Sequence, residues 1–475
     1  MGITLIGEQV KRLRNECTGQ APVHFYRKAC GVVLGLALGM TPFSAAAAAT
    51  SAYAAAAPTK KVTIIRPATQ SADDFYRMRK GAPLWFTPKA GDAADQVVAL
   101  LSSSSLDGLS PERYQVSALQ QAIATARQGK PKDVERADRM LSNAFVSYLR
   151  DLKRDPGLGI LYVDPSLKPA APSALAALIG ASNAPSLSAY VRDMGWMSPI
   201  YAELRKALAD HRYTSDRERQ LLTLNLERAK TLGGGRGRYI IVNAAQQRLY
   251  TYENGKQVDS MVVVVGKPKY PTPMMTAYVR FASLNPYWFV PPDLAAERIA
   301  PKVLKQGLKY LDDLGYQIMS SWKPDAQIIE PNTIDWKAVA EGKTEVFMRQ
   351  LPGPHNSMGR MKFMFPNEAG IYLHDNPERE LFREAARLYS GGCVRLEDAP
   401  RLGRWLFGRD LDWQGAGTEQ MVPLQTPVPV YITYLTAMPS EDGSSIAFTD
   451  DVYGRDAGQL ATLQSSAGAV ASAGR

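Results

Sequence analysis

Cysteine and histidine are both scarce in this chain. Only Cys17, Cys30 and Cys393 and four histidines occur in 475 residues. They show no spacing typical of a metal-ligand cluster, so no zinc or other metal site and no cofactor is expected. Cys17 and Cys30 both lie near the N-terminus, so Cys393 has no disulfide partner in the rest of the chain.

Sequence patterns for binding nucleic acids or nucleotides are also missing. The formal net charge is +10, but no block of basic residues is interleaved with aromatic residues, and nucleic-acid binding is therefore excluded. The glycine-rich stretch LGGGRGR at 232–238 lacks the Lys-Ser/Thr of a phosphate loop and is interpreted as a linker. The composition, 45% hydrophobic and 21% charged, is that of a globular protein of several domains.

The first 54 residues have the order of a secretory signal peptide. Five basic residues precede the apolar run GVVLGLALGM at 31–40, and an alanine-rich stretch follows with a cleavage pattern at Ala52-Tyr53-Ala54. The alternative is an uncleaved anchor in the inner membrane. Without residues 1–54 the chain has 51 basic and 44 acidic residues, a formal charge of +7. This charge favours an anionic cell wall or membrane surface as partner.

The pattern from about Asp73 to Lys230 is helical. Residues 55–75 are expected to form a linker and residues 76–236 an all-helical domain. An apolar stripe at helical spacing in 137–153 predicts one long helix. Ser215 and Glu218 have the spacing of a capping box, which predicts a second helix that ends near Lys230.

From 237 to 440 the alternation changes to that of strands, with Asn254-Gly255 as a two-residue hairpin turn. Residues of about 291–349 return to short helical patterns and are interpreted as an inserted lid. Residues 441–455 are expected to be a C-terminal extension. The last segment, 456–475, is rich in Ala, Gly and Ser and is expected to be disordered.

The segment around Cys393 combines groups suited to nucleophilic catalysis. GIYLHDN places His374 at the end of a strand. Asn376 is expected to cap a helix that begins at Pro377 and ends by Tyr389, so that the glycine turn SGGC returns Cys393 to His374. A thiolate is a strong nucleophile, and an imidazole can accept its proton and return it to a leaving amine. The alternative is a buried cysteine and a strand-end histidine that are held by packing alone.

Neighbouring residues supply further expected roles. Gly391 and Gly392 allow positive φ, and the N–H groups of Gly392 and Cys393 can point at a developing oxyanion. Arg395 suits a substrate carboxylate. Asp375 follows His374 directly and should point to the opposite face, so a backbone carbonyl is expected to orient the imidazole.

These residues resemble the signature of the L,D-transpeptidases: a His, a gap, then Ser/Thr-x-Gly-Cys-x-Arg/Asn. The matching positions are His374, Ser390, Gly392, Cys393 and Arg395. Gly391 stands where many members have a second histidine. Further segments, including NPYWFVPP and RQLPGPHNSMGRMKFMFPN, resemble the YkuD-type catalytic domain of the large Gram-negative branch. APLWF and LDGLSPERY resemble its helical scaffold domain, and about 80% of the chain is covered in all.

The resemblance implies a multidomain α+β fold, with an all-helical scaffold domain followed by a β-rich catalytic domain with an inserted helical lid. It also implies a periplasmic enzyme of cell wall biogenesis whose partners are peptidoglycan peptide stems. Cys393 would attack the third residue of a tetrapeptide stem and expel D-alanine, and His374 would carry the proton. A second stem would then complete a 3→3 cross-link, and carbapenems would inhibit. Substrate contacts are expected from Arg395, Ser390, Gly391 and Tyr372.

Three other functions stay open. The same acyl transfer could use water, as in an L,D-carboxypeptidase, or could attach a protein to peptidoglycan. A non-catalytic wall-binding scaffold protein is the third possibility.

Overall fold

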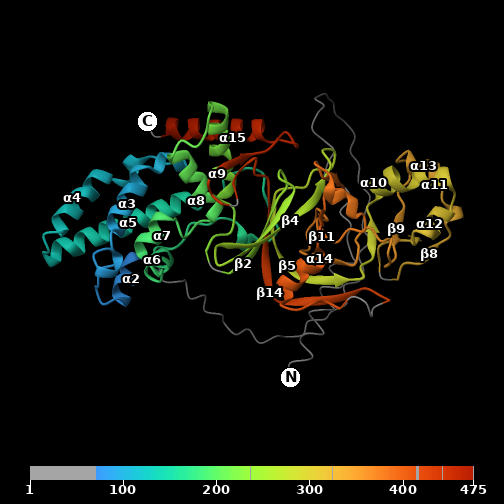
Figure 1. Cartoon of the computed structure of the whole chain (residues 1–475), viewed down its shortest axis with the longest axis horizontal. Helices are drawn as coiled ribbons and strands as arrows, with labels where there is room; N and C mark the ends of the chain where they lie inside the picture. The colour runs from blue at the N-terminus through green and yellow to red at the C-terminus, as the bar shows by residue number, and fades with distance from the viewer. Residues whose placement is uncertain (1–70, 236, 324, 413–416, 441, 474–475) are drawn as a thin grey trace, which may run out of the picture.

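The computed structural model describes residues 71–473 except 236, 324, 413–416 and 441. The predicted signal segment 1–54 and most of the predicted linker lie outside these residues. Figure 1 shows three parts in a row: a helical part at one end, a β sheet in the centre and a smaller mixed part at the other end. The predicted fold class, a helical domain followed by a β-rich domain with an insertion, is confirmed.

The helical part contains eight α-helices between Ala72 and Ala229. They are α2 (Ala72–Met78), α3 (Ala93–Ser102), α4 (Val116–Ala126), α5 (Pro131–Leu152), α6 (Ala174–Ser182), α7 (Leu187–Arg192), α8 (Pro199–Ala209) and α9 (Asp216–Ala229), with short 3-10 turns at Pro88–Ala90, Ser104–Asp107, Pro111–Tyr114 and Pro165–Leu167. The predicted stripe in 137–153 is the buried face of α5. Helix α2 begins inside the predicted linker because Ser71 and Asp74 form a capping box.

The start of α9 differs in one detail from the prediction. The Ser215 hydroxyl accepts a hydrogen bond from the Glu218 N–H, as expected of an N-cap. The Glu218 carboxylate, however, accepts from the N–H of Thr214 rather than from that of Ser215. The helix ends at Ala229, close to the predicted Lys230.

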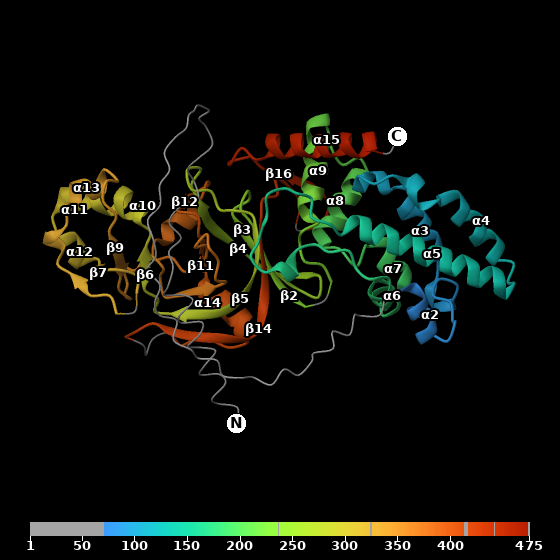
Figure 2. The same cartoon turned by 180° about the vertical axis from the view of Figure 1, so that it is seen from behind.

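The central sheet closes on itself. Its strands are β2 (Arg238–Asn243), β3 (Arg248–Glu253), β4 (Lys256–Gly266), β5 (Met275–Leu284), β10 (Met361–Met364), β11 (Leu373–His374), β12 (Leu388–Ser390), β13 (Val394–Leu396) and β14 (Gln420–Thr433). The order is β5-β10-β11-β13-β4-β3-β2-β14, and a further pairing of β14 with β5, seen side by side in Figure 2, closes the path. The short β1 (Leu161–Tyr162), from the helical part, pairs with β5.

Strand β2 lies between two hydrophobic cores. Ile240 and Val242 belong to the core enclosed by the sheet, whereas Tyr239 and Ile241 belong to the core of the helical part. Successive side chains point to opposite faces of a strand, so both faces of β2 are buried. The Asn254-Gly255 hairpin between β3 and β4 is confirmed, and both residues have positive φ (50° and 79°).

The insertion after β5 is more than the predicted set of short helices. Its elements are β6 (Trp288–Val290), α10 (Pro292–Leu294), a π-helical turn (Ala295–Ile299), α11 (Ala300–Gln306), α12 (Lys309–Asp313), β7 (Tyr316–Met319), β8 (Ile328–Ile329), a 3-10 turn (Pro331–Thr333), α13 (Trp336–Ala340) and β9 (Phe347–Gln350). The strands form a separate antiparallel sheet in the order β6-β9-β7-β8. The insertion has its own hydrophobic core, which makes it a small folded unit.

The predicted helix between Asn376 and Tyr389 is wrong. Only a 3-10 turn, η7 (Arg379–Arg383), forms there, and the chain then extends into β12. Asn376 cannot cap a helix because its side-chain oxygen accepts a hydrogen bond from Arg395 and its amide donates to the Glu378 carbonyl. Leu388 instead pairs with Val265 of β4, so sheet pairing replaces the helix.

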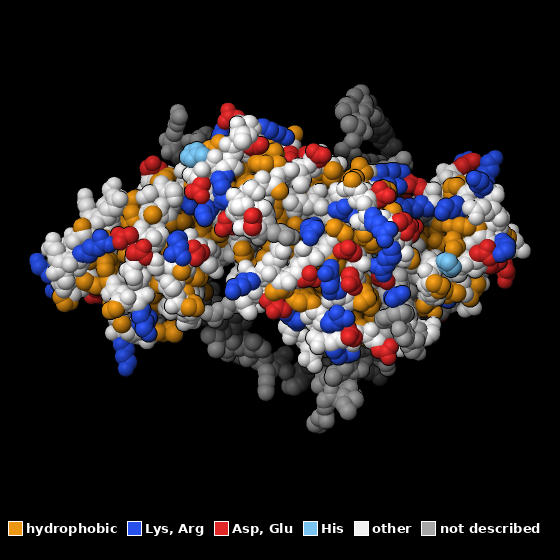
Figure 3. All heavy atoms as spheres, in the orientation of Figure 1, with side chains coloured by type: hydrophobic (Ala, Val, Ile, Leu, Met, Phe, Trp, Pro, Cys, Tyr) orange, Lys and Arg blue, Asp and Glu red, His pale blue; other side chains and the backbone are white. Residues whose placement is uncertain are grey.

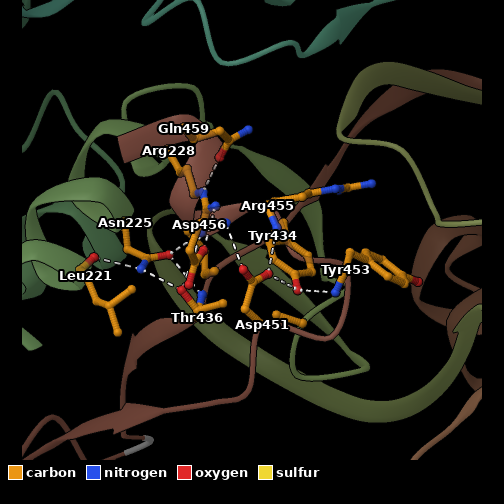
Figure 4. A network of polar contacts seen from close by, with 12 residues as sticks. Leu221, Asn225, Arg228, Tyr434, Thr436, Asp451, Tyr453, Arg455, Asp456 and Gln459 are labelled. Carbon is orange, nitrogen blue, oxygen red and sulfur yellow. Dashed lines mark hydrogen bonds and ion pairs between the residues drawn. The ribbon is translucent and has the colours of Figure 1, made fainter. Parts of the chain in front are cut away.

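The prediction of a disordered tail is also wrong. After α14 (Ala399–Phe407) and a hairpin of β15 (Ala437–Pro439) and β16 (Ile446–Phe448), the chain forms α15 (Asp456–Ala473), which lies beside α9. Asp456 forms a buried ion pair of 2.8 Å with Arg228 of α9. Gln459 also accepts a hydrogen bond from Arg228, so one helix anchors the other (Figure 4).

The surface in Figure 3 shows Lys and Arg side chains interspersed with Asp and Glu rather than gathered in a single basic patch on this face. Within the part of the chain that the structure describes, no helix is long and apolar enough to cross a membrane.

Candidate active site

A row of three side chains crosses three neighbouring strands of the central sheet. Lys362 of β10 pairs with His374 of β11, and His374 pairs in turn with Arg395 of β13. Paired residues in adjacent strands project from the same face, so the imidazole has a cation on either side. The sequence pattern does not indicate Lys362 as a site residue, because its pairing partner His374 lies 12 positions away on another strand.

His374 is buried and its ring is fixed by the backbone. The Nδ1 atom lies 2.6 Å from the carbonyl oxygen of Asp375. This carbonyl requires Nδ1 to carry the proton, so Nε2 is the basic nitrogen. The predicted orientation of the imidazole by a backbone carbonyl is confirmed. The Asp375 carboxylate points elsewhere, to Arg379 and to the Arg360 N–H.

The surroundings keep this imidazole neutral. Burial is the main cause that lowers the pKa of His374 to about 3, and the charges of Arg395 and Lys362 add to it. The backbone hydrogen bonds to Asp375 and Met358 oppose this shift only in part. His374 is therefore a neutral proton acceptor at any pH near 7.

Cys393 lies in the turn between β12 and β13 and is partly accessible. The next residue, Val394, donates its N–H to the Tyr372 carbonyl at 3.0 Å, which ties the turn to the strand that carries His374. The Sγ atom lies 3.4 Å from the Gly370 carbonyl oxygen, its hydrogen-bond partner among the described residues, and it makes no hydrogen bond to the His374 ring. Burial raises the pKa of the Cys393 thiol to about 11, although the Tyr372 N–H and both neighbouring cations lower it. The resting pair is a neutral thiol and a neutral imidazole.

Ser390 holds the glycine turn in shape. Its hydroxyl accepts a hydrogen bond from the Gly392 N–H at 3.0 Å and donates to the Cys393 carbonyl at 2.6 Å. The prediction that the Gly392 N–H faces an oxyanion is therefore contradicted in this state, because that donor is already used. Ser390 is buried and holds the turn in place of the predicted substrate contact. Gly392 has φ of 116°, a conformation that requires glycine.

The insertion contacts this turn. A Cβ placed on Gly391 would lie 3.1 Å from the Leu294 side chain of α10, so glycine allows the close approach. Arg298 donates to the Tyr389 carbonyl at 3.1 Å. Glu297 accepts from Tyr270 at 2.6 Å and pairs with Lys269. Gly391 is nevertheless exposed, so its predicted contact with a substrate stays a prediction.

Arg395 is less open than its predicted role requires. Its guanidinium donates to Asn376 at 3.2 Å and pairs with Glu378 at 2.9 Å. The Glu378 side chain is 58% exposed, so it can release the arginine when a stronger anion arrives. The Nε atom of Arg395 is buried and has no hydrogen-bond partner among the described residues.

Two family models match the chain. The L,D-transpeptidase catalytic domain (YkuD) matches residues 237–430, and this range contains every active-site residue named so far. A scaffold domain matches residues 70–208. A protein of Haemophilus influenzae named "Putative L,D-transpeptidase" is 26% identical over 399 residues, which are 80% of this chain and 77% of the relative. The chain belongs to the L,D-transpeptidase family.

Solved structures of L,D-transpeptidases are more distant. The match to one from Mycobacterium smegmatis covers 41% of this chain and 58% of that one, with 13% identity and a TM-score of 0.21. The match to a cysteine-to-serine mutant from Enterococcus faecium covers 52% and 89%, with 13% identity and a TM-score of 0.19.

In this L,D-transpeptidase a chain of hydrogen bonds links the glycine turn to the C-terminal extension of the protein. Thr272 donates its hydroxyl to the Gly392 carbonyl at 2.8 Å. Arg455 donates to the Thr272 carbonyl at 2.9 Å, and Tyr453 donates to the Gly266 carbonyl at 2.6 Å. Arg455 and Tyr453 lie directly before α15 in the network of Figure 4. The C-terminal extension therefore braces the turn that presents Cys393.

The described residues of this L,D-transpeptidase contain no group of three or more His, Cys, Asp or Glu side chains that could hold a metal ion. His211 and His355, the other histidines after the predicted signal segment, lie on loops and are not part of the site.

Proposed function

We propose that the protein is an exported cell-wall L,D-transpeptidase that joins two peptidoglycan stems through a thioester on Cys393. The single observation that carries this proposal is the row Lys362–His374–Arg395 beside the Cys393 turn. It combines a nucleophile, a neutral base with a fixed tautomer, and two cations. The sequence of the first 54 residues supports delivery to the periplasm.

Acylation follows from the neutral resting pair. Because the thiol has a raised pKa and the imidazole a lowered one, proton transfer accompanies attack rather than preceding it. As Sγ bonds to the carbonyl carbon of the third stem residue, the thiol proton passes to Nε2 of His374. The C–N bond to D-alanine then breaks, and Nε2 returns the proton to the leaving amine. The product is a thioester, and His374 is neutral again.

Deacylation repeats these steps with a new amine. The side-chain amine of a diamino acid in a second stem bonds to the thioester carbon and loses one proton to His374. The C–S bond breaks, and the sulfur takes that proton. The Cys393 N–H, which has no hydrogen-bond partner among the described residues, is the donor that we assign to the oxyanion in both halves.

The test uses tetrapeptide muropeptides and the purified protein, with products separated and identified by mass. We expect dimers linked between two diamino acids, with release of D-alanine, and no product from Cys393→Ala. Trimmed tripeptides alone would assign the protein as an L,D-carboxypeptidase. No change in the muropeptides, together with no carbapenem adduct by intact mass, would favour a wall-binding scaffold protein and reject the proposal.

A further inference from the structure

A small pocket lies on the same face of the sheet as the catalytic row. Its lining residues come from three places: strands β5, β10 and β14 with the positions just before them, the segment around β6 of the insertion, and Tyr372. Lys362, whose register partner is His374, projects into it. Tyr372 joins the pocket to the nucleophile, because its backbone contacts the Cys393 turn. A group held in this pocket would therefore lie on the side of the sheet that carries the catalytic row.

The pocket contains an ion pair that is nearly buried. Lys362 Nζ lies 3.2 Å from Glu419 Oε1, and the two side chains are 11% and 17% exposed. Burying such a pair costs desolvation energy, so it adds little to stability relative to apolar residues. The surrounding walls are apolar and aromatic, from Phe281, Tyr287, Trp288, Phe289, Met358, Met364 and Met421.

Neither charged group uses all of its hydrogen-bonding atoms within the described residues. The contacts of Glu419 with Ser283 and with Lys362 both use Oε1, so Oε2 has no partner among the described residues. The Lys362 ammonium has three hydrogens, and its two acceptors there are Glu419 and the Tyr287 carbonyl at 3.4 Å. One carboxylate oxygen and one N–H are therefore left for a ligand, with the Lys362 ammonium lying over the Tyr372 ring.

The free volume suits a small charged group. The pocket has a volume of about 60 Å³, and one water needs about 10–15 Å³ in this measure. That is room for about four or five water-sized groups, which matches a terminal –CH(NH3+)COO– unit. The oxygen left on Glu419 suits the ammonium, and the hydrogen left on Lys362 suits the carboxylate.

We propose that Lys362 and Glu419 form a subsite for a free amino-acid end, with an ammonium and a carboxylate on one carbon. This inference rests on the proposed function and names the acceptor that the site selects. D-alanine has this structure once it has left, and so has the free end of a diamino-acid side chain that carries a carboxylate beside its amine. One pocket can therefore release the first group and admit the second.

This subsite separates the possible acceptors. A lysine side chain of a protein has an amine but no carboxylate beside it, so it can satisfy Glu419 but not Lys362. Water carries neither of the two charges that this pair would select. The pocket accordingly favours transfer between stems over attachment of a protein or hydrolysis.

The binding experiment uses three probes with the folded protein: D-alanine, propionate and ethylamine, each titrated by calorimetry or by NMR. We expect D-alanine to bind at least tenfold more tightly than either probe with a single charge. Glu419→Gln and Lys362→Met should each weaken D-alanine binding at least tenfold. Matched controls are Glu341→Gln and Lys343→Met, which remove the charges of an exposed ion pair on the insertion and should bind D-alanine as the wild type does.

Equal binding of the three probes to the wild type overturns the subsite, and so does unchanged D-alanine binding in both pocket variants. If the pocket variants do not fold, the preference of the wild-type protein for D-alanine over propionate and ethylamine tests the subsite. Carbapenem acylation of Cys393, read by intact mass, tests the proposed function separately. Acylation without selectivity for D-alanine rejects the subsite alone, whereas no acylation of the wild type rejects the proposed function.

Discussion

Arg228 in α9 and Asp456 in α15 form an ion pair of 2.8 Å that is almost completely buried. The pair joins the last helix of the helical part to the C-terminal helix. Figure 4 shows the network around it, in which Asn225 contacts Thr436 and Asp451 contacts Tyr434. Through Arg455 and Tyr453 the same network reaches the turn that presents Cys393.

Asp456→Asn should destabilise the protein by about 3–5 kcal/mol, because it leaves the buried Arg228 charge without its partner. Urea unfolding of the variant and the wild type measures this difference. Asp216→Asn, which removes an exposed partner of Arg219, is the control and should change stability by less than about 1 kcal/mol. Equal effects of the two variants would show that the buried pair has no special role.

The Cys393 thiol should react with iodoacetamide in a pH-dependent way set by its raised pKa. Because the pKa is about 11, the thiolate fraction and the rate should rise about tenfold per pH unit from pH 7 to pH 10. An unperturbed thiol would reach a plateau above its pKa of about 8.5. The rate is measured by mass on a chain that begins at residue 55, with Cys393→Ala as the unreactive control. A plateau below pH 9 would contradict a neutral thiol with a raised pKa.

Transpeptidation should not be lost through protonation of His374 between pH 7 and pH 5. The lowered pKa, about 3, keeps the imidazole neutral over this range, whereas an ordinary histidine with a pKa of about 6.5 would be mostly protonated at pH 5. His374→Ala should keep the fold, as judged by circular dichroism, and lose about 10²–10⁴-fold in turnover. Carbapenem acylation of Cys393, which needs no amine acceptor, isolates this effect: a tenfold or larger fall in its rate from pH 7 to pH 5, without loss of structure, would contradict this assignment.

Glu297→Gln should loosen the insertion over the glycine turn. The carboxylate pairs with Lys269 and Lys267, and the neutral amide cannot. We expect faster alkylation of Cys393 by a small reagent and slower turnover of muropeptides, because a more open site admits water and holds the acceptor less well. Glu341→Gln, on the outer part of the insertion, is the matched control. Parallel losses in both assays would indicate misfolding rather than opening of a lid.

The sequence by itself determined the features that depend on local chemistry. Asn254-Gly255 makes a hairpin because both residues tolerate positive φ, and the apolar spacing in 137–153 makes α5 because one face of that helix is buried. The SGGC turn likewise needs glycine at 392, where φ is 116°. His374 and Cys393 could be singled out because a thiol and an imidazole are unusual and reactive side chains.

The tertiary structure decided what depends on partners far apart in the chain. Residues 388–390 form β12 rather than the end of a helix because β4 offers backbone groups for pairing, and the Ala-rich tail is helical because Arg228 and α9 hold its first turn. Lys362 becomes part of the catalytic row only through the register of β10 with β11. The Gly392 N–H is taken by Ser390 because of the exact path of one turn. Local propensity cannot specify such pairings, since their energy comes from groups that only the folded chain brings together.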